Sequence, residues 1–152
     1  MKKYILTLLG ITLAGGAAAQ LKPEEAIKFR QSAYTTMAWN MHRIKDNVEG
    51  KYNKDEVIKA ANVIQSIANS GLGSLYLPGT DKGKGWKETR LKPELFKAEN
   101  REKVGKLATN FSREANEMAK VAATGDAAAA KTQFGKLGET CKACHDDFRT
   151  KE

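Results

Sequence analysis

Four segments of the chain carry apolar residues at steps of three and four, which is the spacing of one face of an α-helix. They cover residues 26–48, 57–68, 104–121 and 130–148. Each apolar stripe can bury one side of a helix and leaves a polar side for solvent. The pattern predicts an all-α fold, and an antiparallel four-helix bundle is the architecture that covers four such faces.

Residues with helix-end preferences stand at the borders of these segments. Pro23 suits the first turn of a helix, where its missing N–H costs nothing. Asn53, with Glu56 three residues later, is a variant of the capping box. Gly125 follows the third segment as a C-terminal glycine, and Asp126 can cap the fourth. These signals predict short connections after the first and third helices.

The last helical segment contains the pattern C-x-x-C-H, formed by Cys141, Cys144 and His145. On a helix, positions i, i+3 and i+4 share one face. Two thiols on one face can add to the two vinyl groups of one porphyrin, and the adjacent imidazole can bind its iron. The sequence therefore predicts one covalently bound haem c inside the bundle.

Two other interpretations of the cysteine pair are weaker. A redox-active dithiol is typical of a strand-helix-strand context, and a zinc site normally requires a second pair of ligands. The chain has only two cysteines and two histidines, and the second histidine, His42, is about a hundred residues away. A disulfide or dithiol remains the alternative to haem attachment.

A glycine-rich stretch, residues 71–92, separates the second and third helical segments. Loops of this length in compact domains usually have a function or lack order. We expect this crossover loop either to cover an edge of the haem, with Trp86 as its anchor, or simply to connect distant helix ends.

The N-terminus has the three parts of a secretory signal peptide. Lys2 and Lys3 precede an apolar run over residues 5–13, and small residues fill positions 17–19. We expect cleavage after Ala19, which leaves residues 20–152 as one domain in the bacterial periplasm with no membrane segment. Covalent haem attachment agrees with export, since this chemistry normally takes place outside the cytoplasm. A retained membrane anchor is the alternative.

The chain is basic, with a formal net charge of +8. Lysines and arginines are dense over residues 82–106, but acidic residues are interspersed among them, so a solvated surface is a better interpretation than a docking patch. An exported chain with few aromatic residues among its lysines has little support as a nucleic-acid binder.

These features together resemble cytochrome c-prime, the class II family of c-type cytochromes. The resemblance rests on the late C-x-x-C-H, on residues 30–34 (RQSAY), on 78–81 (PGTD) and on 89–94 (TRLKPE). It implies a periplasmic four-helix bundle, and a homodimer through the first two helices, for which an exposed Trp39 would be suitable.

The resemblance also implies a role for individual residues. His145 would be the only protein ligand of the iron, with Arg149 as a basic neighbour on the same, proximal side. Tyr34 would be the bulky residue on the distal side. The residues implied at the haem edge, near the propionates, are Arg30, Gln31, Thr89 and Arg90.

A five-coordinate iron under an apolar roof favours small neutral gases, because anionic ligands would lose their hydration. The resemblance implies nitric oxide and carbon monoxide as ligands, with nitric oxide buffering as the expected role. The alternative is an electron carrier with a redox partner protein, in which Met37 would be the sixth ligand. We expect that the protein is not an enzyme, since the apolar stripe that carries Tyr34 has no histidine or carboxylate for acid-base catalysis.

Overall fold

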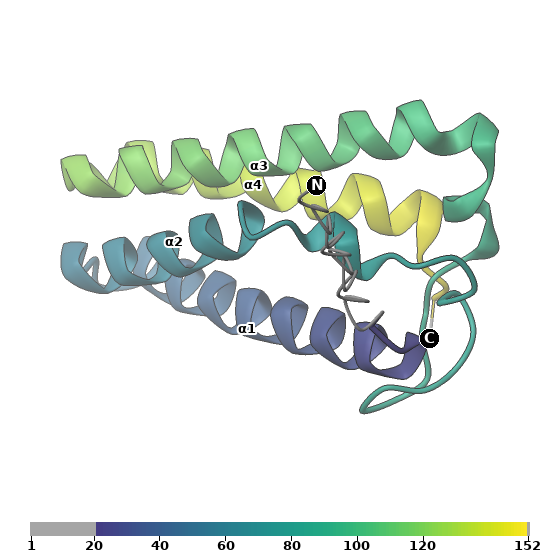
Figure 1. The fold of residues 1–152 in the computed structure, drawn as a ribbon. Helices are drawn as coiled ribbons and strands as arrows, with labels where there is room; N and C mark the ends of the chain where they lie inside the picture. The colour runs from purple at the N-terminus through teal and green to yellow at the C-terminus, as the bar shows by residue number, and fades with distance from the viewer. Residues whose placement is uncertain (1–20, 152) are drawn as a thin grey trace, which may run out of the picture.

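The computed structural model describes residues 21–151, so the expected signal peptide, residues 1–19, lies outside the described part. Within that part, four long helices form the all-α bundle that the sequence predicts (Figure 1). They are α1 (Pro23–Glu49), α2 (Lys54–Ala68), α3 (Arg101–Thr124) and α4 (Ala127–Phe148). Three short 3₁₀ helices lie between α2 and α3, namely η1 (Leu72–Leu75), η2 (Pro93–Phe96) and η3 (Ala98–Asn100).

The helices pair in the order of the chain. Short turns make α1 antiparallel to α2, and α3 antiparallel to α4, while residues 69–100 cross from one pair to the other (Figure 1). The crossover lies at the end of the bundle where α1 begins and α4 ends, and α1 and α4 diverge toward this end (Figure 1). Among the described residues, no helix is both long and apolar enough to span a bilayer.

The predicted helix ends are found in the structure. Gly125 adopts a left-handed conformation (φ 81°) after α3, and the Asp126 carboxylate accepts hydrogen bonds from the amides of Ala128 (2.9 Å) and Ala129 (3.0 Å). A glycine is required at the first position, because a side chain at positive φ is strained. The connection between α3 and α4 is therefore encoded by two adjacent residues.

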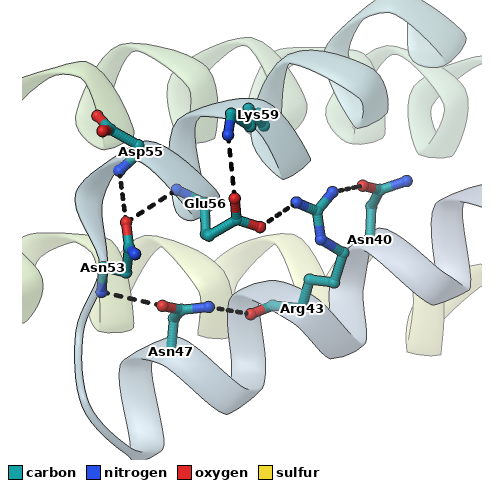
Figure 2. A network of polar contacts seen from close by, with 7 residues as sticks. All are labelled: Asn40, Arg43, Asn47, Asn53, Asp55, Glu56 and Lys59. Atoms are coloured by element: carbon teal, nitrogen blue, oxygen red, sulfur yellow. Dashed lines mark hydrogen bonds and ion pairs between the residues drawn. The ribbon is translucent and has the colours of Figure 1, made fainter.

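The capping box at the start of α2 forms only in part. The Asn53 side chain accepts from the amides of Asp55 (3.1 Å) and Glu56 (3.2 Å), as the sequence predicts (Figure 2). The Asn53 amide, however, donates to Asn47 Oδ1 at 2.9 Å. The Glu56 carboxylate instead accepts hydrogen bonds from Arg43 of α1 and from Lys59 (3.1 Å).

The buried apolar core occupies the half of the bundle that contains the two short turns. Its members come from all four helices and are Ile44, Val57, Ala60, Ala61, Ile64, Ala115, Met118, Ala119, Ala122, Ala130 and Leu137. On α4 this cluster ends at Leu137, one turn before Cys141. The C-x-x-C-H motif lies beyond this cluster, in the other half of the bundle.

One position in the first half of α1 differs from the predicted apolar stripe. Phe29, which has the three- and four-residue spacing of the stripe predicted over residues 26–48, is 56% exposed, whereas Ile27 (1%) and Arg30 (4%) are buried. The crossover loop causes the difference, because its backbone lies directly on this face of α1. A Cβ at Gly85 would be 2.8 Å from the Lys28 amide nitrogen and 2.9 Å from Ile27 Cγ2. Periodicity within one helix cannot indicate which face a distant loop will cover.

Candidate functional site

Cys141, Cys144 and His145 lie in the last turns of α4, beyond the end of the buried core. Both cysteines are half-buried and are not joined by a disulfide, and His145 is exposed. Burial raises the pKa of both thiols. Reactive redox dithiols have lowered pKa values, so this environment argues against the dithiol interpretation. Among the described residues, no three His, Cys, Asp or Glu side chains cluster as a metal site would require.

The surroundings of the motif suit an apolar macrocycle. Several apolar side chains of α1, α3 and the crossover are only half-buried at this end, and they include Ala33, Leu72, Leu75, Leu91, Phe96 and Leu107. Their apolar surface would gain free energy by contact with a porphyrin. Two cysteines at the correct spacing, at the end of the bundle that has these half-buried apolar side chains, fit covalent haem.

The imidazole of His145 has a cationic neighbour. Arg149 Nη1 lies 3.4 Å from His145 Nδ1. The two acidic neighbours are engaged elsewhere, since Asp146 pairs with Lys142 (2.5 Å) and Asp147 with Lys103 (2.9 Å). Burial lowers the pKa of His145, and the charges of Arg149 and Arg90 lower it further.

The end of the crossover pairs with the end of the chain. The amide of Lys92 donates to the Phe148 carbonyl, and the amide of Thr150 donates to the Arg90 carbonyl, both at 2.9 Å. Arg90 Nη2 also donates to the Thr150 carbonyl at 2.9 Å. These bonds place Arg90 beside Arg149 and His145, so the structure brings together three of the residues that the resemblance implied.

Tyr34 of α1 is 39% exposed and lies near both cysteines. Its hydroxyl lies 2.6 Å from the hydroxyl of Tyr76 in the crossover. Burial raises the pKa of Tyr34, and the sulfurs of Cys144 and Cys141 are near enough to raise it further. The pKa of Tyr76 is also raised, mainly by burial, and Cys144 contributes. Both phenols therefore share one region with the haem-attachment motif.

Arg30 is buried beneath the crossover loop. Its Nη1 donates to the Leu75 carbonyl and to Thr80 Oγ1, both at 3.0 Å. Its Nη2 donates to the Thr80 carbonyl (2.9 Å) and to Thr89 Oγ1 (3.1 Å). All four terminal N–H groups of the guanidinium are thus used by the loop, which leaves the single Nε–H for other acceptors. Thr89, implied at the haem edge, is one of these loop partners.

Gln31 and Trp86 form a second attachment of the loop to α1. The Gln31 side chain donates to the Lys87 carbonyl (2.7 Å) and accepts from the Trp86 amide (2.8 Å). The Trp86 indole donates to Ser32 Oγ at 2.9 Å but is 69% exposed. Trp86 therefore fixes the loop to the outside of α1.

Sequence reasoning did not identify Tyr76 or Thr80 as site residues. Thr80 is fully buried, and its only signal was its place in the PGTD turn at residues 78–81. Tyr76 lies in a segment without helical periodicity, so nothing in the local pattern indicated its contact with Tyr34.

Comparisons with known proteins agree with this geometry. The profile of the family described as Cytochrome C' matches residues 25–149. A relative named Cytochrome c', from Rhodocyclus tenuis, is 61% identical over 132 residues, or 86% of this chain and 98% of the relative.

Two solved structures illustrate the likeness in fold. A cytochrome c' with an unusual ligand-controlled dimer dissociation is 56% identical, with a TM-score of 0.82 over 88% of this chain and 100% of that one. A ferrous variant of the Alcaligenes xylosoxidans protein with bound NO is 27% identical, with a TM-score of 0.74 over 86% of this chain and 98% of that one.

An antiparallel four-helix bundle with C-x-x-C-H in its last helix defines a class of c-type haem proteins. Because the family profile and the relative from Rhodocyclus tenuis both match most of its length, this chain belongs to the cytochrome c' family. It accordingly carries one covalently bound haem c.

Proposed function

We propose that this protein is a periplasmic haem protein whose five-coordinate iron binds nitric oxide and carbon monoxide, and that it buffers nitric oxide. Cys141 and Cys144 would attach the haem, and His145 would be the only axial protein ligand. The haem supplies an iron centre that can bind a diatomic gas at its open position. The protein residues determine which ligands reach that position.

The chemistry of Tyr34 carries this proposal. Its hydroxyl is hydrogen-bonded to Tyr76 at 2.6 Å, and its pKa is raised mainly by burial. Phenolate ligation would require loss of a proton whose reference pKa is already about 10. Tyr34 therefore stays neutral at physiological pH and acts as a bulky cover instead of a ligand.

The other candidate ligands have less support. Met37 is 5% exposed, as expected of a flexible core residue. His42 is exposed and stands eight residues after Tyr34, about 12 Å along the helix axis. No histidine or carboxylate lies on α1 between residues 26 and 41 to assist peroxide cleavage, which favours a binding protein over an enzyme.

Ligand choice would follow from the half-buried apolar lining. An anion that enters loses its hydration and finds few donors in return, whereas a neutral diatomic gas loses little. Two solved family members support ligand binding in this fold, one with bound NO and one whose dimer dissociation is ligand-controlled. Nitric oxide and carbon monoxide are the ligands that fit this chemistry best.

The proximal side would weaken the bond to His145. Iron-binding histidines usually donate Nδ1–H to a carboxylate or carbonyl, which increases their basicity. Here the neighbour is the Arg149 guanidinium at 3.4 Å, and the nearby aspartates pair with lysines. A weakly donating His145 could be displaced when nitric oxide binds, and replacement of Arg149 by Ala should then change the kinetics of that displacement.

A homodimer through α1 and α2 forms part of the proposal. Trp39 is 60% exposed on α1, and the Arg43 guanidinium lies 5.0 Å from its ring. An exposed indole beside a cation suits an interface. Replacement of Trp39 by Glu should shift the protein to monomer in sedimentation velocity, whereas an unchanged sedimentation coefficient would contradict the interface.

Absorption spectra of the purified holoprotein test the central claim. We expect high-spin, five-coordinate iron in both oxidation states, and a spectral change on addition of nitric oxide or carbon monoxide but not of azide. The variant Met37→Leu should give the same spectra as wild type. Six-coordinate, low-spin iron in both oxidation states, lost in Met37→Leu, would overturn the proposal in favour of an electron carrier.

A further inference from the structure

We infer that Tyr76 is a second residue that controls ligand access, and that Arg30 is the positioning residue that holds it against Tyr34. This inference rests on the proposed function, in which Tyr34 covers the open side of the iron. It adds that the cover consists of two tyrosines, one from α1 and one from the crossover loop.

The two hydroxyls form the first part of this arrangement. Tyr34 and Tyr76 are 42 residues apart, and their Oη atoms are 2.6 Å from each other. An O–H···O distance of this size is at the short end of the ordinary range. Tyr34 therefore cannot rotate away from the site without either breaking this bond or moving Tyr76 with it.

Arg30 fixes the position of Tyr76. Its guanidinium lies 4.9 Å from the centre of the Tyr76 ring, within range of a cation–π contact. It also donates to the carbonyl of Leu75, the residue directly before Tyr76. Arg30 lies on α1 one turn before Tyr34. The same face of α1 therefore carries Tyr34 and, through Arg30, positions Tyr76 beside it.

The loop beyond Tyr76 is held by the same side chain. Thr80 is fully buried and receives two of the Arg30 hydrogen bonds, and Thr89 receives one. A buried guanidinium without these acceptors would be costly, so the loop and Arg30 stabilise each other. Displacement of Tyr34 by a gas would consequently be transmitted to the crossover loop.

A double-mutant cycle tests this coupling. The holoprotein variants are Tyr34→Phe, Tyr76→Phe and the double variant, each of which keeps the ring and removes only a hydroxyl. The matched control is Tyr52→Phe, since the Tyr52 hydroxyl is at the other end of the bundle and has no hydrogen-bond partner among the described residues. Two quantities are measured, the association rate of carbon monoxide with the ferrous protein and hydrogen exchange in residues 72–80.

We expect Tyr76→Phe to accelerate carbon monoxide association about fivefold, the factor that corresponds to one lost hydrogen bond. Tyr34→Phe should accelerate it similarly, and the double variant should add little, because both changes remove the same bond. Hydrogen exchange in residues 72–80 should become faster in both single variants, and Tyr52→Phe should behave as wild type.

Two outcomes separate this inference from the proposed function. If Tyr34→Phe accelerates association while Tyr76→Phe leaves the rate and the exchange unchanged, Tyr76 does not control access and the inference is wrong, although the gas-binding proposal stands. If the two effects are independent and multiply, the coupling through the hydrogen bond is absent. Spectra of six-coordinate iron in the wild type would instead overturn the proposed function itself.

The role of Arg30 is tested with Arg30→Lys, which keeps the charge but not the planar set of donors. We expect faster carbon monoxide association and faster exchange in residues 72–80, as in Tyr76→Phe. Combined with Tyr76→Phe, Arg30→Lys should produce no further acceleration. An unchanged association rate in a folded Arg30→Lys variant, with wild-type helix content by circular dichroism, would exclude the positioning role.

Discussion

Arg30 is the residue at which a binding role and a structural role meet. A charged side chain is rarely buried unless it is paired or fully hydrogen-bonded. Arg30 is 4% exposed and has four hydrogen bonds to the crossover loop. Contact with a haem propionate remains a prediction, and only the Nε–H would be available for it. The same side chain thus connects the loop, the two tyrosines and α1.

The first prediction concerns Gly125, at the turn between α3 and α4. Its φ is +81°, so Gly125→Ala should lower the free energy of unfolding by about 1 kcal/mol, the cost of a left-handed conformation for an L-residue. The matched control is Gly135→Ala within α4, where no atom outside the helix would meet the added Cβ. This change should raise stability by up to about 1 kcal/mol. Urea denaturation measures both, and equal effects of the two substitutions would contradict the argument.

Tyr52 supports a second prediction at the same scale. Its hydroxyl is buried and has no hydrogen-bond partner among the described residues, and burial raises its pKa. An unpaired buried hydroxyl costs free energy, so Tyr52→Phe should leave the protein as stable as wild type or stabilise it by about 1 kcal/mol. A loss of more than about 1 kcal/mol in urea denaturation would indicate a partner for this hydroxyl.

At the scale of elements, α1 and α2 are joined by a polar network at their shared turn (Figure 2). Arg43 bonds Glu56 across the two helices and donates to Asn40 Oδ1 at 3.0 Å. Asn47 donates to the Arg43 carbonyl at 2.8 Å and accepts from the Asn53 amide. The network fixes the register of α1 against α2, the two helices that we propose as the dimer interface.

This network predicts a pH dependence of stability. Hydrogen bonds from Arg43 and Lys59 lower the pKa of Glu56. A carboxyl with a lowered folded-state pKa stabilises the fold above its unfolded pKa, about 4.3, and this contribution is lost as the pH falls through the folded-state value. In Glu56→Gln, stability should be lower than wild type at pH 7, and the difference should shrink as the pH falls below about 4.3. A constant difference across this range, measured by urea denaturation, would exclude the linkage.

The elements also indicate what a sequence can predict here. Helical periodicity and the caps at Asn53, Gly125 and Asp126 determine the helices locally, so these predictions are confirmed. The prediction that Phe29 is buried was wrong, because the crossover loop, distant in sequence, decides which side chains of α1 are covered. The C-x-x-C-H motif was identifiable because its chemistry lies within five consecutive residues. Tyr76 was not identifiable, since its role depends on a contact across 42 residues.

For the whole molecule, the two halves of the bundle differ in how they are stabilised. The half with the short turns has a fully buried aliphatic core that ends at Leu137. The half with Cys141 and Cys144 has fewer buried apolar side chains, among them Ile27, Leu95 and Phe148, and hydrogen bonds of the crossover and half-buried apolar side chains complete it. Haem contacts should therefore contribute most of the stability of the second half, because a group that binds the native state stabilises it.

Removal of the haem tests this division. The variant Cys141→Ala/Cys144→Ala cannot attach haem. In this variant, amides of residues 72–92 should exchange at least about tenfold faster than in the holoprotein. Exchange of amides around Val57 and Met118 should change much less, because local opening follows local contacts. Hydrogen exchange with mass spectrometry measures both regions in one experiment. Equal acceleration along the whole chain would mean that the bundle unfolds as a single unit and that the aliphatic half does not persist without the haem.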